Sequence, residues 1–411
     1  MLRWIIFFAL YIFLDWYAFK AFKSITKHPF IYGVYWTLSA LVLGNFVYEM
    51  LLNPSHLKVL THSKSYALGF LLVALAPKLI LLVILGFEDL VRLPQGAYRF
   101  FKKDKRELGY FPARRAFISK IAIGLAAIPF AGLLYGMYKG KYDFRVLKYT
   151  LTFDDLPEAF DGYKITQISD IHSGSFDDRE KIEYAIDLIN EQESDVLLFT
   201  GDMVNNLSSE MIPWKDTFGR LKAKDGKFSV LGNHDYGDYV EWDSEAEKAQ
   251  NLEELKAIQK DIGFDLILND NRFLEKDGDR IALVGVENWG RGHFKKAGDL
   301  KKAASKIDEN DFKILMSHDP SHWEDQVIDD DYFYHLTLSG HTHGMQFGIE
   351  IPGWIKWSPI KWRYKYWAGI YKEKGQFINV NRGFGFLGYP GRAGIWPEIS
   401  VIELKKSPRN A

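Results

Sequence analysis

The 411-residue chain contains no cysteine. This absence excludes disulfide frameworks, cysteine-zinc sites, thiol nucleophiles and iron–sulfur clusters, but it does not distinguish a reducing from an oxidising compartment. The chain also has little net charge, because 52 Lys and Arg residues oppose 53 Asp and Glu residues. Apolar residues make up 47% and charged residues 26%, which argues against a disordered or fibrous protein. The length is that of two or three domains.

The two signs of charge are distributed unevenly along the chain. Residues 1–142 carry 18 Lys and Arg against 6 Asp and Glu, whereas residues 143–411 carry 34 against 47. Because a phosphate backbone recruits basic faces, the acidic second part argues against a nucleic-acid partner and against a nuclease.

Four apolar stretches in residues 1–142 are long enough to cross a bilayer, which needs ~20 residues of helix. They are Trp4–Phe22, Phe30–Leu52, Tyr66–Leu85 and Phe117–Tyr138. A cleaved signal peptide would be followed by a soluble chain, whereas three more spans follow the first one here. We therefore predict a transmembrane region of four helices, rather than buried helices of a soluble domain.

Charged residues interrupt these spans. Asp15, Glu49 and Lys78 each lie within a predicted span. A charge in hydrocarbon costs a few kcal/mol, so these side chains should face other helices or lie near the membrane interfaces. Two alternatives remain for Lys78: an ion pair with Asp15 or Glu49 inside the bundle, or an extended side chain that reaches the headgroups.

The Lys and Arg residues between the spans predict the orientation. The first loop carries Lys23 and Lys27, and the second carries only Lys58 and Lys64. The third is richest, with Arg92, Arg99, Lys102, Lys103, Lys105, Arg106, Arg114 and Arg115. Loops one and three should therefore face the cytoplasm. We expect a multi-pass protein of a bacterial inner membrane, with residues after Tyr138 on the periplasmic or external side.

The pattern changes after Lys141 to short β-branched runs separated by amphipathic stretches. Strands are predicted at Arg145–Phe153, Tyr163–Ser169, Val196–Thr200, Lys227–Leu231, Arg280–Val286, Lys313–Ser317, His335–Ser339, Phe377–Asn381 and Glu398–Leu404. Helices are predicted at Arg179–Gln192, Ser208–Lys222, Ser244–Asp261, Asp299–Ile307 and Ser321–Ile328. This alternation predicts an α/β domain over residues 143–411, with its functional residues where strands end.

Five small polar motifs follow predicted strands directly. They are Asp170-Ile171-His172, Gly201-Asp202, Gly232-Asn233-His234-Asp235, His318 and Gly340-His341-Thr342-His343. Imidazole nitrogen with carboxylate or amide oxygen suits divalent transition metals, and the glycines allow the sharp turns that such convergence needs. One such motif is weak evidence, but five in succession at strand ends predict a metal site.

This succession of motifs resembles that of the calcineurin-like metallophosphoesterases, over about residues 144–404. The resemblance implies two β-sheets flanked by helices, a four-layer sandwich. It is nearest to membrane-anchored bacterial members, including twin-arginine-exported envelope phosphoesterases and UDP-2,3-diacylglucosamine pyrophosphatases. The pair Arg114-Arg115 before an apolar run is similar to a twin-arginine export signal, although it is internal. An arginine pair that keeps the end of a transmembrane helix on the cytoplasmic side would explain it equally well.

The resemblance also implies a ligand set for two divalent ions, which in the family are Mn, Fe or Zn. One ion would be held by Asp170, His172, Asp202 and His343. The second would be held by Asp202, Asn233, His318 and His341, with the Asp202 carboxylate bridging. Asn205 is a departure, because many relatives carry Asp there, but it lies outside the ligand set.

Two cations ~3.5–4 Å apart can hold a bridging hydroxide and neutralise a phosphoryl group during in-line attack. His234 follows a ligand without being needed as one. We therefore predict that His234 protonates or stabilises the leaving oxygen, and that Asp235 orients its ring. The remaining histidines of this region, His293, His322 and His335, are interpreted as structural or solvated.

An aromatic and basic insertion occupies residues 345–375. It contains Trp354, Trp357, Trp362, Tyr364, Tyr366 and Trp367 among Lys356, Lys361, Arg363 and Lys365. Such residues favour the bilayer interface and anionic headgroups, so the segment either rests on the membrane beside the substrate entrance or forms a lid with its aromatics packed inward.

Two arginines flanked by glycines, Arg382 and Arg392, are candidates to bind a second phosphate or the leaving group, and surface salt bridges are the alternative.

Taken together, the sequence predicts a membrane-anchored, dinuclear metal-dependent phosphoesterase. Its substrate would carry a phosphoester or pyrophosphate on a lipid or envelope component, and membrane lipids would be its other partners. Two alternatives remain: a cytosol-facing UDP-2,3-diacylglucosamine pyrophosphatase of lipid A synthesis, and a non-catalytic membrane sensor with a phosphatase-derived domain.

Overall fold

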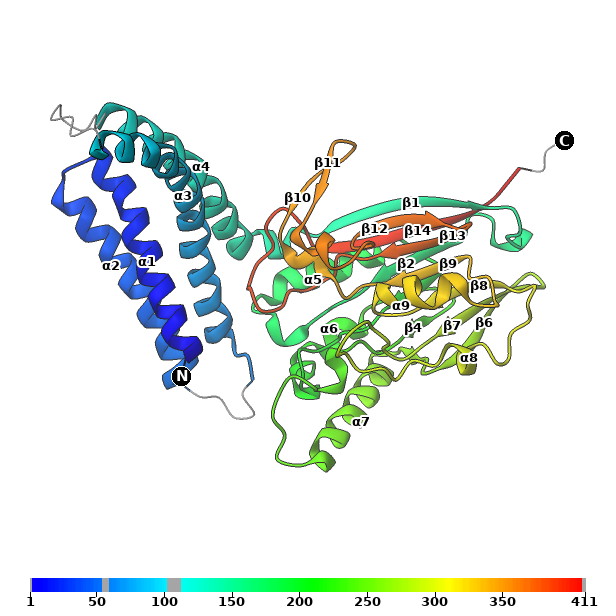
Figure 1. Ribbon diagram of the computed structural model, residues 1–411. Helices are drawn as coiled ribbons and strands as arrows, with labels where there is room; N and C mark the ends of the chain where they lie inside the picture. The colour runs from blue at the N-terminus through cyan, green and yellow to red at the C-terminus, as the bar shows by residue number, and fades with distance from the viewer. Residues whose placement is uncertain (1, 54–58, 102–111, 409–411) are drawn as a thin grey trace. The chain divides into compact units, whose positions relative to one another are not determined.

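A computed structural model describes residues 2–53, 59–101 and 112–408. Their contacts divide the chain into two compact units, which follow one another in the sequence at Tyr138 and Lys139. The first unit is entirely helical and the second is an α/β domain (Figure 1).

The first unit consists of four long apolar helices (Figure 1). They are α1 (Leu2–Ile25), α2 (Pro29–Val47, continued by the π-helical turn η1, Tyr48–Leu52), α3 (His62–Phe101) and α4 (Pro112–Tyr138). Each is long and apolar enough to cross a membrane, which confirms the four predicted spans. Helix α3 is much longer than the predicted span. Lys58, Lys102, Lys103, Lys105 and Arg106, which contributed to the predicted orientation, lie outside the described residues.

Lys78 forms an ion pair with Asp15 inside this unit, with both side chains at most 9% exposed. Ser39 joins them: its hydroxyl accepts a hydrogen bond from Lys78 Nζ at 3.1 Å and donates one to Asp15. The Tyr35 hydroxyl donates to the same carboxylate at 3.1 Å. Glu49 instead accepts a hydrogen bond from a serine hydroxyl, so the pair with Asp15 is the alternative that the structure confirms.

A second buried ion pair involves the arginine pair at the start of α4. Arg115 is 7% exposed and contacts Glu88, and its Nη1 lies 2.8 Å from an oxygen of Asp89. The side chain of Arg114 is exposed. Arg115 is therefore neutralised between helices and does not present its charge to solvent.

The α/β domain contains two six-stranded sheets. The first has the order β1 (Arg145–Phe153), β14 (Glu398–Lys406), β2 (Lys164–Ile168), β3 (Val196–Phe199), β4 (Lys227–Ser229) and β5 (Asp265–Leu266). The second has the order β12 (Gly369–Glu373), β13 (Gln376–Val380), β9 (Leu336–Ser339), β8 (Phe312–Met316), β7 (Asp279–Gly285) and β6 (Asp270–Lys276). Strands β2, β3 and β4 are parallel to one another, as are β7, β8 and β9. The carboxyl ends of each set therefore lie at the same edge of their sheet.

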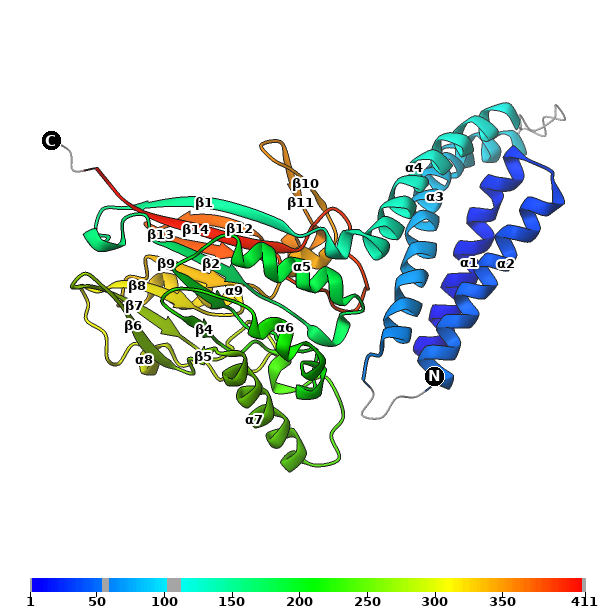
Figure 2. The same ribbon diagram turned by 180° about the vertical axis from the view of Figure 1, so that it is seen from behind.

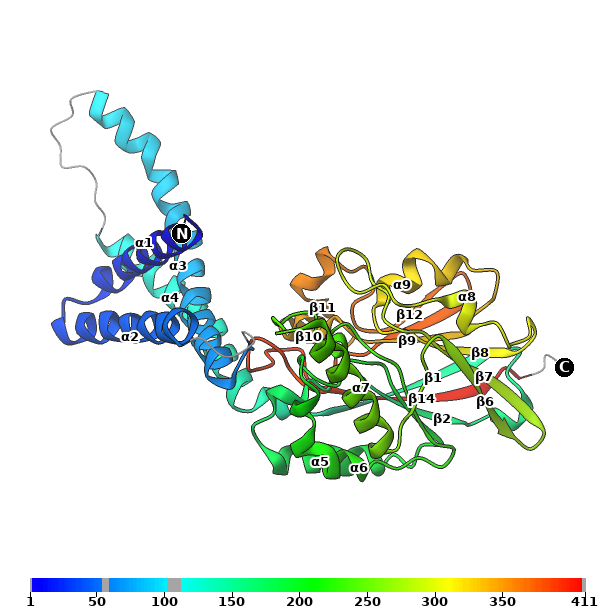
Figure 3. The same cartoon turned by 90° about the horizontal axis from the view of Figure 1, so that it is seen from below.

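The domain has four layers, as Figure 3 shows. One core lies between the sheets, where fully buried residues such as Val196 and Leu198 of β3 meet Ile314 and Met316 of β8. Helices α5 (Arg179–Asn190), α6 (Lys215–Gly219) and α7 (Glu245–Ile262) cover the outer face of the first sheet (Figure 2). The short helices α8 (Leu300–Ala303) and α9 (Pro320–Asp325) cover the second. This arrangement confirms the predicted four-layer sandwich.

The nine predicted strands are all present, with ends that differ by at most two residues. The predicted helix Ser208–Lys222 is wrong. Pro213 has no backbone N–H group and therefore cannot donate the hydrogen bond that a helix interior needs. The segment forms the 3-10 turns η6 (Ser208–Glu210) and η7 (Ile212–Trp214) before α6 begins. Helices α8 and α9 are shorter than predicted. Strands β5, β6 and β12 and the hairpin of β10 (Ile349–Ile351) and β11 (Ile355–Trp357) were not predicted.

Candidate metal centre

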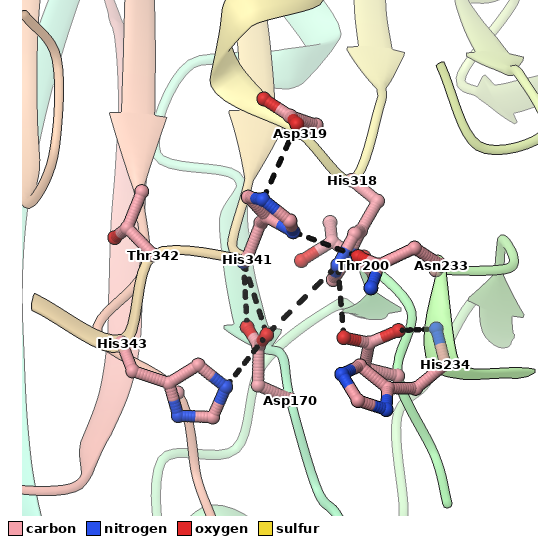
Figure 4. Close-up of polar contacts among 12 residues, drawn as sticks. Asp170, Thr200, Asn233, His234, His318, Asp319, His341, Thr342 and His343 are labelled. Atoms are coloured by element: carbon pink, nitrogen blue, oxygen red, sulfur yellow. Dashed lines mark hydrogen bonds and ion pairs between the residues drawn. The ribbon is translucent and has the colours of Figure 1, made fainter. Parts of the chain in front are cut away.

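The five polar motifs converge beyond the carboxyl ends of five strands. Strands β2, β3 and β4 of the first sheet lead to the first three motifs, and β8 and β9 of the second sheet lead to the other two. Figure 4 shows the side chains pointing toward one another from both sheets. All seven predicted ligands are brought together: Asp170, His172, Asp202, Asn233, His318, His341 and His343.

The donor atoms form two groups. Asp170, His172 and His343 offer atoms within 4.8 Å of one another, and Asp202, His318 and His341 do the same. In the first group, His343 Nε2 lies 3.1 Å from Asp170 Oδ1 and 3.0 Å from His172 Nε2.

Asp202 lies between the two groups. Its Oδ2 is 3.1 Å from His318 Nε2 in the second group and 3.7 Å from His172 Nε2 in the first. Asn233 extends the second group, because its Oδ1 lies 2.7 Å from His341 Nδ1. The imidazole, carboxylate and amide donors of both groups are of types that suit divalent transition metals, and one carboxylate lies between the groups.

The backbone at five of these ligands adopts the left-handed conformation, which is costly for residues other than glycine. The φ angles are 52° at Asp170, 48° at His172, 61° at Asp202, 68° at His341 and 51° at His343. Each such conformation costs on the order of 1–3 kcal/mol and persists only where the surrounding structure enforces it. The strands therefore hold the ligands in place at the expense of local stability, which is typical of a functional site.

Two glycines of the motifs are required for space. A Cβ atom at Gly232 would lie 2.2 Å from a carboxylate oxygen of Asp202. A Cβ at Gly340 would lie equally close, at 2.2 Å, to an oxygen of Asp170. The prediction attributed the glycines to sharp turns, whereas these two allow the chain to pass directly against the ligand carboxylates.

His318 is oriented as a metal ligand requires. Its Nδ1 donates a hydrogen bond to the Thr200 carbonyl at 2.7 Å, which leaves Nε2 as the atom that can bind a metal ion. Nε2 is buried and faces Asp202 Oδ2 at 3.1 Å. An imidazole that donates one N–H to a carbonyl and turns its other nitrogen toward the other ligands has the usual geometry of a ligating histidine. The residues present therefore fit a metal ion.

His341 and Asn233 are oriented by residues that the sequence did not single out as part of the site. His341 Nε2 lies 2.8 Å from the Tyr364 hydroxyl and 3.3 Å from Asp319 Oδ2. The amide nitrogen of Asn233 donates to the Tyr239 hydroxyl at 2.8 Å, so its oxygen faces His341 Nδ1. Tyr364 belongs to the aromatic insertion, which thus contacts a ligand.

The charges of the site favour anionic carboxylates. Burial alone would raise the pKa of Asp170, but His343 and His318 lower it below its ordinary value. The pKa of Asp202 is likewise lowered, because His318 and His234 outweigh its burial. The same carboxylates raise the pKa of His318 to about 10 against its burial.

The predicted contact between Asp235 and the ring of His234 is wrong. The Asp235 carboxylate accepts backbone N–H groups of Asp202 at 2.9 Å, of Met203 at 2.8 Å and of Gly232 at 2.9 Å. Asp235 therefore ties two ligand-bearing loops together. Burial and the nearby Asp202 raise the pKa of Asp235 to about 7.

The ring of His234 is held by Asn205 instead. Nδ1 of His234 donates to the Asn205 carbonyl at 2.7 Å, and the ring lies edge-on to His172 with centroids 4.9 Å apart. His234 is thus beside the ligands without joining either donor group, as predicted from its place after Asn233.

The two candidate phosphate-binding arginines are buried, which corrects the expectation of exposed loops. Arg382 pairs with Glu398 at 2.5 Å and with Glu350 at 2.5 Å, so it forms salt bridges, but they are buried rather than at the surface as the alternative expected. Arg392 is fully buried, donates from Nε to the Gly385 carbonyl at 2.8 Å and lies 3.3 Å from His343 Nδ1. Neither guanidinium faces solvent.

The other histidines have the structural or solvated roles that were predicted. His322 is buried and its Nδ1 lies 2.8 Å from the Ser317 hydroxyl. His335 accepts the backbone N–H of Lys313 at 2.9 Å, and His293 is exposed.

The aromatic insertion combines features of both predicted alternatives. Tyr364, Tyr366 and Trp367 pack inward and are 5–6% exposed. Trp354, at the turn of the β10–β11 hairpin, is 78% exposed, and Trp362 is 75% exposed. One part of the segment therefore closes over the protein and contacts His341, while another part presents indoles to its surroundings.

Both units match known families. Residues 163–345 match the family described as "Calcineurin-like phosphoesterase". Residues 2–141 match the family described as "Probable Calcineurin-like phosphoesterase, transmembrane domain".

Three relatives illustrate the similarity. The chain is 30% identical over 304 residues to the uncharacterized metallophosphoesterase YkuE of Bacillus subtilis, which covers 72% of this chain and 98% of the relative. It is 25% identical over 391 residues to an uncharacterized metallophosphoesterase of Helicobacter pylori, and the match covers 94% of this chain and 92% of the relative. It is also 25% identical over 282 residues to a transmembrane protein with metallophosphoesterase domain of Danio rerio, covering 67% and 60%. The protein is therefore a membrane-associated member of the calcineurin-like metallophosphoesterase family.

Proposed function

We propose that this protein is a membrane-anchored, dinuclear metal-dependent hydrolase of a phosphoester or pyrophosphate bond. The observation that carries the proposal is the position of Asp202, whose carboxylate lies between two groups of donor atoms. A pair of divalent ions held there would supply a hydroxide at neutral pH and neutralise the charge of a phosphoryl group.

The residues around the ligands have separate tasks in this proposal. Asn233 contributes a neutral oxygen, which limits the negative charge that an anionic substrate meets. His234 has its Nδ1 proton engaged with the Asn205 carbonyl, so Nε2 is the atom that exchanges a proton with the leaving oxygen. Asp235 holds the loops of Asp202 and Gly232 by their backbone N–H groups and keeps the ligands in register.

We further propose that the substrate is attached to a lipid or another component of the cell envelope. The four apolar helices keep the catalytic domain at a membrane, where such substrates are concentrated. The exposed indoles of Trp354 and Trp362 and the exposed Lys361 support contact with lipid, because tryptophan and lysine favour the bilayer interface.

We also propose that the catalytic domain faces the periplasm or the cell exterior. The support is the excess of Lys and Arg in loops one and three, which favours a cytoplasmic position for those loops. A reporter that is active only outside the cytoplasm, fused after Leu404, should be active. A reporter that fluoresces only in the cytoplasm should be dark in the same position, and the reverse result would favour a cytosol-facing enzyme.

The catalytic proposal is tested with the full-length protein in detergent. The protein is stripped of metal, dialysed, reloaded with manganese and assayed with p-nitrophenyl phosphate. We expect about two bound manganese ions per chain and hydrolysis that depends on them. Asp202→Asn is the matched control and should lose both. A chain that binds the ions but hydrolyses no phosphate ester would instead be a sensor.

A further inference from the structure

An exposed arginine lies one aromatic ring away from the metal centre. The Arg363 guanidinium is 5.4 Å from the ring centroid of Phe294, and the Phe294 ring meets the ring of His341 edge-on at 4.8 Å. A second path leads to the same ligand. Arg363 is 5.6 Å from the Tyr364 ring, whose hydroxyl lies 2.8 Å from His341 Nε2. Two independent ring contacts therefore fix Arg363 beside the site.

Arg363 differs from Arg291 and Lys365 in having no ionic partner among the residues that the structure describes. In the part of the chain that the structure describes, no carboxylate lies within 4.0 Å of its guanidinium. By contrast, Arg291 pairs with Asp325, and Lys365 pairs with Glu373 at 2.9 Å. A guanidinium stacked on rings but free at its nitrogen atoms is prepared to bind an anion with two parallel hydrogen bonds.

The charge of the domain gives a local cation special weight. Residues 143–411 carry an acidic excess, so the domain as a whole does not attract an anionic substrate. A second exposed cation, Lys295, follows Phe294 directly, and its Nζ lies 5.7 Å from the Tyr236 ring centroid. Arg363, which contacts the Phe294 ring, is therefore the exposed cation with a printed contact path to His341.

The distance of Arg363 from the ligands decides which group it meets. A scissile phosphoryl would sit against the metal ions, whereas an aromatic ring separates Arg363 from His341. We propose that Arg363 binds a second phosphate of the substrate, adjacent to the one that is hydrolysed. This inference rests on the proposed function and narrows its substrate class to diphosphate esters and other compounds with two neighbouring phosphates.

The test compares two inhibitors of p-nitrophenyl phosphate hydrolysis by the full-length, manganese-loaded protein. Inorganic phosphate has one phosphoryl group, and methylenediphosphonate has two that cannot be separated by hydrolysis. In Arg363→Gln, the ratio of the two inhibition constants should shift by about tenfold or more against the diphosphonate, because one charge-assisted interaction is lost. Arg363→Lys should keep part of the preference. Calorimetric titration of methylenediphosphonate should show the same loss without turnover.

Lys365→Gln is the matched control. It also removes one positive charge, two residues from Arg363, but the Lys365 side chain is already paired with Glu373. It should leave the ratio unchanged. The inference would be overturned if Arg363→Gln bound both inhibitors as the wild type does, or if it bound both more weakly by the same factor.

Failure of the proposed function would look different, because the wild-type protein would then show no metal-dependent hydrolysis. Calorimetry would still report whether Arg363 contributes to diphosphonate binding.

Discussion

Nδ1 of His234 donates a hydrogen bond to the backbone carbonyl of Asn205 at 2.7 Å. The backbone N–H of His234 in turn donates to Asp202 Oδ1 at 2.8 Å, so the residue is fixed at both ends beside the ligands. The contact at position 205 uses a main-chain oxygen, which every residue type provides. The hold on His234 therefore does not depend on which side chain stands at position 205.

His234→Ala should keep the metal ions and lose rate. His234 belongs to neither donor group, whereas its free Nε2 is suited to proton exchange with a leaving oxygen. A positioned acid or base contributes roughly 10²–10⁴-fold, so kcat should fall by that factor while the manganese content of the purified protein is unchanged. The two readouts are single-turnover hydrolysis and elemental analysis of the same sample.

His318→Ala is the contrasting variant. His318 has a buried Nε2 that faces Asp202 and lies in one of the donor groups, so its removal should lower the metal content as well as the rate. If His234→Ala lost metal to the same extent as His318→Ala, the role assigned to His234 would be wrong.

Glu210 should make stability fall as pH rises. Its carboxylate is held by the backbone N–H groups of Asn205 at 2.5 Å and Leu207 at 3.3 Å, and burial raises the pKa of Glu210 to about 7. Because the folded-state pKa lies above the unfolded one, the stabilisation is complete below about pH 4.5 and is lost as pH passes through about 7. The loss amounts to roughly 3 kcal/mol at most.

Glu210→Gln keeps the neutral form at every pH, so thermal unfolding of this variant between pH 5 and pH 8 should be flatter than that of the wild type. Glu191→Gln, at an exposed position, is the control and should follow the wild-type curve. Parallel curves for Glu210→Gln and the wild type would show that Glu210 does not titrate in this range. Since Glu210 holds the Asn205 segment, kcat of the variant also reports on the placement of His234.

Much of the fold and the ligand set could be predicted because both are encoded locally. Strands such as β3 and β8 are short, buried and mostly apolar, and a Gly-Asp or Ser-His pair follows each of them closely. The helix Ser208–Lys222 was mispredicted because apolar spacing was given more weight than Pro213. Strand β6 has the polar sequence of an edge strand and pairs with β7 alone, so it lacks the apolar signal of a buried strand.

The rest of the site depends on tertiary contacts that have no local signal. Thr200 and Asn205 act through carbonyl groups, which are the same in every residue. Tyr364 contacts His341 across 23 positions of the chain, and nothing in its local sequence distinguishes it from the other aromatic residues of the insertion. The arginines flanked by glycines were misassigned because flanking residues do not reveal whether a guanidinium is already paired, as Arg382 is.

Exchanging the charges of Asp15 and Lys78 should restore stability that either single change removes. Both side chains are nearly buried, and an unpaired buried charge costs about 3–5 kcal/mol. Asp15→Lys and Lys78→Asp alone should each lower the unfolding temperature of the full-length protein in detergent. The double variant should recover most of the loss, although Ser39 and Tyr35 are placed for the native arrangement. A double variant less stable than both single variants would show that the ion pair is not a separable unit.

The exposed tip of the β10–β11 hairpin should insert into the headgroup region of an anionic bilayer. Trp354 is 78% exposed at the turn, Ile351 is 43% exposed beside it, and Lys361 adds an exposed positive charge nearby in the sequence. Because the chain contains no cysteine, Trp354→Cys can be labelled at that position alone with an environment-sensitive fluorophore. The labelled protein is placed in vesicles of phosphatidylglycerol and phosphatidylcholine, or in vesicles of phosphatidylcholine alone. The emission of the label should lie further to the blue in the anionic vesicles than in the neutral ones.

A label at Tyr184→Cys, a 55% exposed position on α5, provides the comparison and should remain in an aqueous environment in both vesicles. The pair of labels separates local contact from general crowding at the membrane, since the same helices anchor both positions. If position 354 reported water as fully as position 184, the indoles would not rest on lipid. The hairpin would then be the outer edge of a lid whose inner edge is Tyr364. The proposal of a lipid-attached substrate would then rest on the four apolar helices alone.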